Sequence, residues 1–198
     1  SSPDNPYTVV LVGVTGDGKS TTGNSVIGTD VFKTSGGFRS STEECASADC
    51  FRAGGFWRVV DTIGFQDTDL SAAEVGQRFV EFGVHVPEGV DIFIFCIRWG
   101  RFKPEHDAAL TAFQRYCGDK ALAHTVLVFT HCPESHEDLQ AALADAPQSL
   151  KGWVSKVQAV RGLDNATGVG ISELMQSAVG IIDRNAGRRY SNSELEEA

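Results

Sequence analysis

Gly13-Val14-Thr15-Gly16-Asp17-Gly18-Lys19-Ser20 is the stretch that decides the fold, and the apolar run 8–12 (TVVLV) precedes it. Residues 21–28 after it have the composition of a helix. This order of strand, glycine-rich loop and helix matches the P-loop pattern GxxxxGK[ST] in the context that the pattern needs. Loops of this kind bind phosphate, because their N–H groups and the positive end of the helix face the anion. The sequence therefore predicts a phosphate site; a plain glycine-rich turn before a helix is the alternative.

Each residue type in this loop has an expected role. Gly13 and Gly18 let the backbone approach an anion closely. Lys19 is expected to reach the β- and γ-phosphate oxygens, and the Ser20 hydroxyl to bind Mg²⁺. We expect the Asp17 carboxylate to face solvent, because it would repel a triphosphate. The predicted nucleotide-binding residues of the loop are Gly16, Asp17, Gly18, Lys19, Ser20 and Thr21.

Composition narrows the class of protein. The 198 residues fit one domain with a substantial core. The formal charge of −9 argues against a surface that coats nucleic acid, since such surfaces depend on clustered Lys and Arg. The five cysteines are odd in number and lack framework spacing, which predicts a reduced, cytoplasmic protein. No apolar run reaches the roughly 20 residues that span a bilayer, so we expect no membrane span in this chain.

Strand and helix patterns alternate along the rest of the chain. Gly54-Gly55 separates two strand-like runs and predicts a hairpin of 45–51 with 56–60. Further strands are expected at 90–97, 124–130 and 157–160, helices at 73–86, 103–116, 137–146, 149–156 and 171–185, and a mobile loop at 31–41. This alternation predicts an α/β fold, a mostly parallel, doubly wound sheet with helices on both faces and ligand loops at the carboxyl ends of its strands. The domain is expected to span 1–185, and the extension 186–198 to begin a further helix.

A second motif, Asp61-Thr62-Ile63-Gly64, ends the predicted hairpin strand. A DxxG sequence in this position, downstream of a P-loop, is typical of switch NTPases. Asp61 would hold Mg²⁺ through a water molecule, and the Gly64 N–H would bind the γ-phosphate while it is present. Asp61 therefore joins Ser20 in the predicted metal site.

Several longer stretches carry a family resemblance: TGDGKSTTGNSVIG (15–28), DTIGFQDT (61–68), GVDIFIFCIRWGRF (89–102), LDN (163–165) and NAGRRYSN (185–192). Together they resemble the immunity-associated nucleotide-binding GTPases, the GIMAP/IAN family, which is related to septins and chloroplast import-receptor GTPases. The resemblance implies a Ras-like P-loop G domain that binds GTP or GDP with Mg²⁺. It also implies nucleotide-dependent association through the nucleotide face, so we expect a homodimer that acts as a molecular switch. Any membrane association would depend on segments outside this chain.

The resemblance also identifies a candidate for the family's first-switch threonine. The family pattern SxTxxC corresponds here to residues 40–45 and places Thr42 as a Mg²⁺ ligand in the triphosphate state. The alternative is a solvent-exposed loop threonine. The predicted metal ligands are therefore Ser20, Thr42 and Asp61.

Recognition of the base departs from the usual pattern. Many GTPases use an Asn/Thr-Lys-x-Asp element whose carboxylate accepts two guanine N–H groups, but residues 130–134 read THCPE and lack that Asp. By resemblance to the chloroplast receptors we expect His131 to stack on guanine, Asp164 to accept from it, and Asn165 to bind O6 or order the loop. Glu134 is the alternative acceptor. Each residue also has a purely structural alternative to base binding. His131 would then only cap local backbone, and Asp164 would only begin a turn.

Hydrolysis needs a positioned water and a neutralised γ-phosphate. Phe65 occupies the position after DxxG where Ras-like enzymes have glutamine, and Gln66 comes one residue later. By resemblance, Arg101 of the GRF sequence acts across a dimer on the partner's phosphates, with Arg98 a weaker candidate. The alternative is an Arg101 that pairs with an acid of its own chain.

The predicted catalytic residues are Lys19, Thr42, Gly64 and Arg101. Two functions of different classes follow from them. One is a GTPase that is slow as a monomer and faster when paired, and the other is a GTP-dependent scaffold that hardly hydrolyses. An ATP-using P-loop enzyme remains a third possibility because the base motif is irregular.

Overall fold

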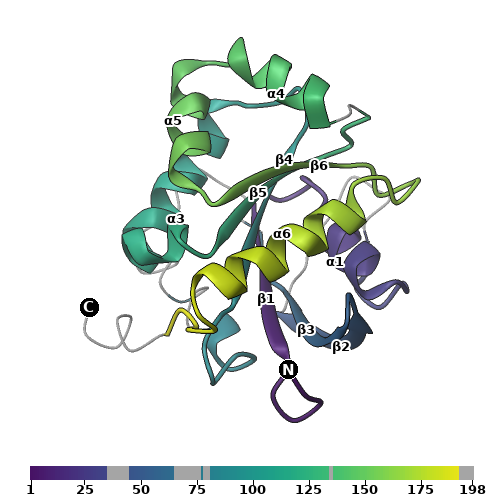
Figure 1. Ribbon diagram of the computed structural model, residues 1–198. Coiled ribbons are helices and arrows are strands. Elements are labelled where there is room, and N and C mark those ends of the chain that lie inside the picture. The colour runs from purple at the N-terminus through teal and green to yellow at the C-terminus, as the bar shows by residue number, and fades with distance from the viewer. Residues whose placement is uncertain (35–44, 65–76, 78–80, 134–135, 192–198) are drawn as a thin grey trace.

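The computed structural model describes residues 1–34, 45–64, 77, 81–133 and 136–191. Within them lies a six-stranded sheet in the order β2-β3-β1-β4-β5-β6 (Figure 1). All neighbouring strands pair in parallel except β2, which is antiparallel to β3. The strands are β1 (Tyr7–Gly13), β2 (Ala46–Arg52), β3 (Gly55–Asp61), β4 (Ile92–Arg98), β5 (Thr125–Thr130) and β6 (Ala159–Leu163).

Helices cover both faces of the sheet and make a three-layered α/β domain. α1 and α6 lie on one face, and α3, α4 and α5 lie on the other (Figure 1). Their bounds are α1 (Lys19–Ile27), α3 (Pro104–Leu122), α4 (His136–Ala144), α5 (Gln148–Lys156) and α6 (Ile171–Arg184). The predicted fold class is confirmed. None of the described helices is both long and apolar enough to cross a membrane.

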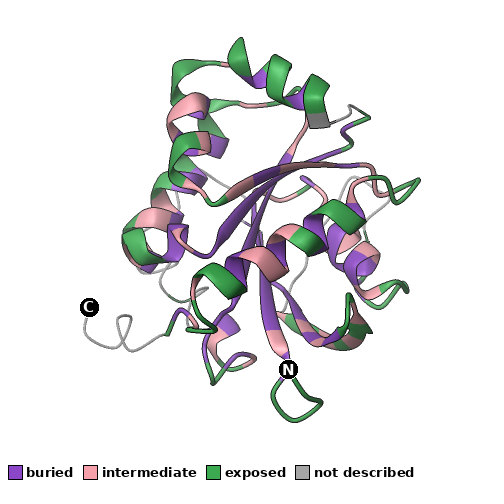
Figure 2. Ribbon diagram, viewed as in Figure 1, coloured by how far each residue is buried: buried purple, intermediate pink, exposed green. Residues whose placement is uncertain are grey.

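The two cores form because successive side chains of a strand point to opposite faces of the sheet. In β4, Phe93, Phe95 and Ile97 face α3 and α5, whereas Ile92 and Ile94 face α1 and α6. Both sets are buried, so β4 reads as a nearly continuous apolar run, as expected of a strand covered on both sides. Figure 2 shows this burial through the centre of the sheet.

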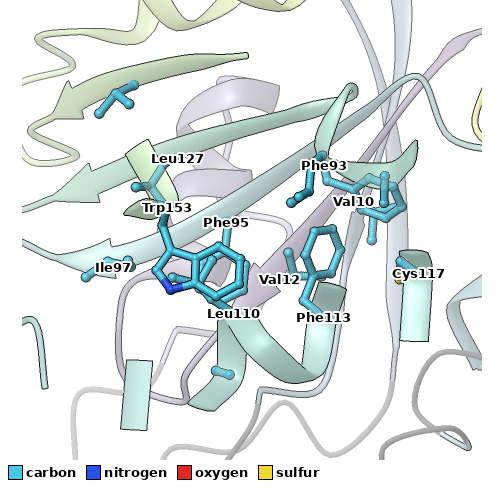
Figure 3. Packing of buried hydrophobic residues seen from close by; sticks show 14 of the residues in the cluster. Val10, Val12, Phe93, Phe95, Ile97, Leu110, Phe113, Cys117, Leu127 and Trp153 are labelled. Atoms are coloured by element: carbon cyan, nitrogen blue, oxygen red, sulfur yellow. The ribbon is translucent and has the colours of Figure 1, made fainter. Parts of the chain in front are cut away.

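Aromatic side chains fill the core on the α3 side. Phe113 of α3 meets Phe93 and Phe95 edge-on, with ring centroids 5.1 Å and 5.9 Å away. Trp153 of α5 packs into the same cluster (Figure 3), and its indole Nε1–H donates to Asp107 Oδ1 at 2.7 Å. This hydrogen bond satisfies the polar atom of a large buried ring and holds α5 against α3.

Some elements differ from their predicted bounds. α3 continues beyond residue 116 to Leu122 across a non-helical Gly118 (φ 72°). β6 begins at Ala159 rather than 157, because Val157 ends α5 as its C-cap. The hairpin of β2 and β3 around Gly54-Gly55 is confirmed. Only Gln77 and residues 81–83 of the expected helix 73–86 are described as helical. Residues 35–41 of the expected loop 31–41 and residues 192–198 of the expected extension lie outside the described residues.

A buried polar cluster fastens the C-terminal segment to the start of β1. Asp91 is 3% exposed, and its Oδ2 accepts the Thr8 N–H at 2.8 Å and Arg189 Nε at 3.0 Å. Arg189 also donates from Nη2 to the Pro6 carbonyl at 2.6 Å. Tyr190 and Val90 exchange two backbone hydrogen bonds beside this cluster. Burial raises the pKa of the Asp91 carboxyl, and the bonds from Thr8 and the Arg189 charge oppose that rise. Arg189 therefore compensates a carboxylate held out of water.

We expect Arg189→Ala to lower the free energy of unfolding by about 3–5 kcal/mol, because it leaves the buried Asp91 carboxylate without its cation. Urea denaturation measures the change. Arg188→Ala is the matched control, since Arg188 is exposed and makes one long bond of 3.4 Å to a backbone carbonyl; it should stay within about 0.5 kcal/mol. Equal stability of the two variants would contradict the prediction, and Asp91→Asn should recover part of the loss in the Arg189→Ala background.

Candidate functional site

The predicted site residues that the structure describes gather at one edge of the sheet, where five parallel strands end. In open α/β sheets this carboxyl edge is where ligands bind. The loop 13–20 follows β1, Asp61 ends β3, Arg98 ends β4 and precedes Arg101, Thr130 ends β5, and Asp164 follows β6. Sequence positions more than 100 residues apart are thus brought together by strand order alone.

The glycine-rich loop begins where β1 runs against β4. Gly13 has φ 140°, and a Cβ there would lie 2.5 Å from the Cys96 carbonyl oxygen, so glycine is required. α1 starts at Lys19 and directs its N-terminus at the loop. Lys19 is 5% exposed, and its Nζ donates to the Val14 carbonyl at 3.4 Å. The lysine is therefore folded back over the loop, at the place where a phosphate-binding lysine belongs.

Ser20 and Asp61, the two described members of the predicted metal site, are in direct contact. Ser20 Oγ donates to Asp61 Oδ2 at 2.5 Å, and Asp61 is 1% exposed. Hydroxyl and carboxylate oxygens are the donors that Mg²⁺ prefers, and Mg²⁺ keeps several waters when so few protein oxygens bind it. This pair fits a magnesium ion bound beside a phosphate. Thr42, the third predicted ligand, lies outside the described residues.

The DxxG glycine lies against the loop. A Cβ at Gly64 would collide with Thr15 Oγ1 and Lys19 Nζ, so the two motifs meet at one point. Thr15 Oγ1 is buried and has no hydrogen-bond partner among the residues that the structure describes. Buried hydroxyls without a partner are unusual. Thr15 was not singled out from the sequence, although its position inside the loop motif was a signal for a residue near phosphate.

The expectation that Asp17 faces solvent is wrong. Asp17 is 7% exposed, and its Oδ2 lies 2.7 Å from Nε2 of His106, which is itself 1% exposed. A buried carboxylate is tolerated because it has this specific partner. His106 was not singled out from the sequence, since it lies 89 residues from Asp17 and belongs to no motif considered.

The end of β5 reaches both the loop and the predicted base site. Thr130 Oγ1 donates to the Asp17 carbonyl at 2.8 Å. His131 follows with φ 54°, an exposed side chain and Nδ1 at 3.3 Å from Thr130 Oγ1. Desolvation and then the charge of Arg98 lower the pKa of His131. The imidazole is therefore neutral at pH 7 and presents an uncharged ring beside the loop.

Asp164 and Asn165 are used in the structure of their own loop. Asp164 Oδ1 accepts the Ala166 N–H at 3.0 Å and Oδ2 accepts the Thr167 hydroxyl at 2.8 Å. Hydrogen bonding from Thr167 and from the Ala166 N–H lowers the pKa of Asp164, so the carboxylate is ionised. Asp164 thus begins a turn in its own loop, as the structural alternative to base recognition expected. Its ionised carboxylate still retains lone pairs that can accept from further donors.

Asn165 ties this loop to α1. Its Oδ1 accepts from Ser25 Oγ at 2.7 Å, and its Nδ2 donates to Thr22 Oγ1 at 3.2 Å. Of the two roles expected for Asn165, ordering the loop is the one these bonds perform. Glu134, the alternative base acceptor, lies outside the described residues, as do Phe65 and Gln66.

Arg101 projects from the turn between β4 and α3. Its N–H donates to the Arg98 carbonyl at 3.2 Å, and its side chain is exposed. Within the described ranges no carboxylate forms an ion pair with Arg101. Pairing with an acid of the same chain, the alternative considered for Arg101, is therefore not observed there. The guanidinium is available at the same edge of the sheet as the loop.

Known proteins resemble this chain in sequence and in structure. Immune-associated nucleotide-binding protein 9 of Arabidopsis thaliana is 32% identical over 157 residues, 76% of this chain, and protein 3 of the same series is 33% identical over 129 residues, 62% of this chain. The crystal structure of Toc33 from Arabidopsis thaliana with Mg²⁺ and GMPPNP superimposes with a TM-score of 0.68 at 19% identity, covering 90% of this chain and 85% of that one. At this identity the likeness establishes the fold.

The chain spans less than half the length of these relatives, 46% of protein 9 and 37% of protein 3. A family model, the AIG1 family, matches residues 7–198. That match includes the loop after β1, the DxxG segment and the Arg101 turn. The chain belongs to the AIG1 family.

Proposed function

We propose that this domain binds GTP and GDP with Mg²⁺ at the carboxyl edge of its sheet and hydrolyses GTP slowly as a monomer. The observation that carries the proposal is the meeting of Lys19, the Ser20–Asp61 pair and Gly64 around one loop. A phosphate chain placed there has a cation, metal ligands and a backbone donor within reach. The similar proteins support it, since the relatives are named nucleotide-binding proteins, and Toc33 was crystallised with GDP and Mg²⁺ and with GMPPNP and Mg²⁺.

Each residue has a distinct task in this proposal. Lys19 neutralises the β- and γ-phosphate oxygens, and Ser20 binds Mg²⁺ directly. Asp61 holds the ion through water, and the Gly64 N–H binds the γ-phosphate until hydrolysis removes it. Mg²⁺, when bound, would supply positive charge that offsets the charge of the phosphates. His131 stacks as a neutral ring on guanine, and Asp164 accepts from the base.

Dimerisation through the nucleotide face completes the proposal. Arg101 is exposed at this edge and would act on the phosphates bound by a second copy. Each copy needs such a group, because Phe65 stands where Ras-like enzymes have the glutamine that orients the attacking water. Dimerization is described as important for the GTPase activity of the chloroplast translocon components atToc33 and psToc159, whose structure covers 88% of this chain with a TM-score of 0.62. Phe65 in place of glutamine also favours a second candidate, a GTP-dependent scaffold with almost no hydrolysis.

Lys19→Ala should weaken binding of GTP and GDP by about 10- to 100-fold, because a charge-assisted hydrogen bond to phosphate is lost. Titration calorimetry with each nucleotide in the presence of Mg²⁺ measures this. Lys120→Ala, an exposed lysine near the end of α3, is the control and should bind as the unaltered protein does. Failure of the unaltered protein to bind either nucleotide would refute the proposed function as a whole.

Arg101→Ala should abolish the rise of specific GTPase activity with protein concentration, since each site then lacks the partner's cation. Phosphate release measured over a wide concentration range tests this, with Arg115→Ala, an exposed arginine of α3, as the matched control. A loss of about 10²-fold or more is expected at high concentration. Activity that stays flat in the unaltered protein would remove the role of the partner, and GTP binding without any phosphate release would support the scaffold.

Asp164→Asn should reduce the preference for GTP over ATP by about 10- to 100-fold, because an amide cannot accept two guanine N–H groups as a carboxylate does. Competition of GTP and ATP for a fluorescent guanine nucleotide measures the preference. Thr167→Val is the control for the loop, since it removes the 2.8 Å bond to Asp164 but keeps the carboxylate. An unaltered preference in Asp164→Asn would move base recognition to Glu134 or to backbone groups.

A further inference from the structure

A buried carboxylate and imidazole connect the phosphate-binding loop to the first turn of α3. Asp17 Oδ2 and His106 Nε2 lie 2.7 Å apart, and both residues are almost fully buried. Asp17 is two residues before Lys19, inside the loop that would surround the phosphates. A negative charge in that loop opposes the binding of an anion, so the direction of this side chain matters for the site.

The hydrogen bonds of His106 fix which of its nitrogens carries the proton. The Lys103 N–H donates to His106 Nδ1 at 2.9 Å, so Nδ1 is an acceptor and is unprotonated. In that neutral tautomer Nε2 carries the proton and donates to Asp17. The carboxylate is thereby held toward α3, while the Thr130 hydroxyl holds the Asp17 carbonyl from the side of β5.

His106 also organises the segment that carries Arg101. Phe102 stacks on the His106 ring, with centroids 5.9 Å apart and planes inclined by 23°. The His106 N–H donates back to the Lys103 carbonyl at 2.9 Å, which closes a reciprocal cap at the start of α3. Arg101 is the residue before Phe102 and is exposed. One imidazole therefore contacts both the loop and the segment from which Arg101 projects.

We propose that His106 is a positioning residue of the nucleotide site. It holds the Asp17 carboxylate away from the bound phosphates, and through Phe102 and Lys103 it anchors the Arg101 segment to the phosphate-binding loop. The inference rests on the proposed function, because it needs a nucleotide in the loop and, for its second part, a partner that Arg101 reaches. Neither Asp17 nor His106 contacts the reacting atoms in this scheme.

Removal of the partner tests the first role. His106→Ala leaves the carboxylate beside the phosphates and should weaken binding of fluorescently labelled GDP and of a non-hydrolysable GTP analogue by about 10-fold or more. Adding Asp17→Asn removes the charge, and the double variant should return to within about 3-fold of the unaltered protein. A structural defect would not be repaired in this way, since Asn does not fill the space that the ring occupied.

Three further variants keep the test decisive if His106→Ala folds poorly. Asp17→Asn alone keeps an acceptor for Nε2–H without the charge and should bind nucleotide at least as tightly as the unaltered protein. His106→Gln keeps a donor toward Asp17 and should bind within about 3-fold. His85→Ala removes a histidine that contacts Ser47 instead and is the matched control. Thermal unfolding of each variant separates lost affinity from lost structure.

The anchoring role has its own measurement. The double variant binds nucleotide but lacks the ring that supports Phe102, so its activity should no longer rise with protein concentration, as expected of Arg101→Ala. A double variant that binds as weakly as His106→Ala would overturn the first role, and one with the full rise would overturn the second. Absence of nucleotide binding by the unaltered protein would instead refute the proposed function.

Discussion

The approach of β1 to β4 at Gly13 is the constraint on which the site depends. A side chain at Gly13 would meet the Cys96 carbonyl, so only glycine lets the chain turn there from the central strand into the loop. The turn aims α1 at the end of the strand and brings Lys19 over the loop. Neighbouring strands then supply Asp61, Thr130 and the Arg101 turn to the same place. The backbone geometry at Gly13 thus determines where the rest of the site is assembled.

Burial on both faces of the sheet keeps the strands that lead into the site rigid. β4 places Phe93 and Phe95 in one core and Ile92 and Ile94 in the other, so a one-residue shift of its register would move each set into the core packed for the other. Functional groups at the ends of such strands are held to the precision of the cores beneath them. The loops that follow the strands add hydrogen bonds between distant segments, such as the bond from Asn165 Nδ2 to Thr22 Oγ1, which spans 143 residues.

The sequence sufficed for features that depend on local pattern. Apolar runs identified β4 and β5, paired glycines identified the hairpin, and spacing identified the loop and the DxxG segment. Features that depend on distant partners were not predictable in this way. Asp17 was expected in solvent because its charge would repel a triphosphate, and its partner His106, 89 residues away and in no recognised motif, was not identified. The start of β6 was predicted two residues too early, because an edge strand carries polar residues such as Arg161 and gives a weak apolar pattern.

The contacts of Arg189 and Tyr190 with the start of β1 and the residues before β4 lie at the opposite edge of the sheet from the site. Arg189 reaches the Pro6 carbonyl beside the start of β1, and Tyr190 pairs with Val90 just before β4. A strand of seven residues separates the two edges by about 20 Å. Both described ends of the domain therefore leave it on the side away from the loop. A molecule immobilised on a sensor surface through either described end would present the loop 13–20 to the solution.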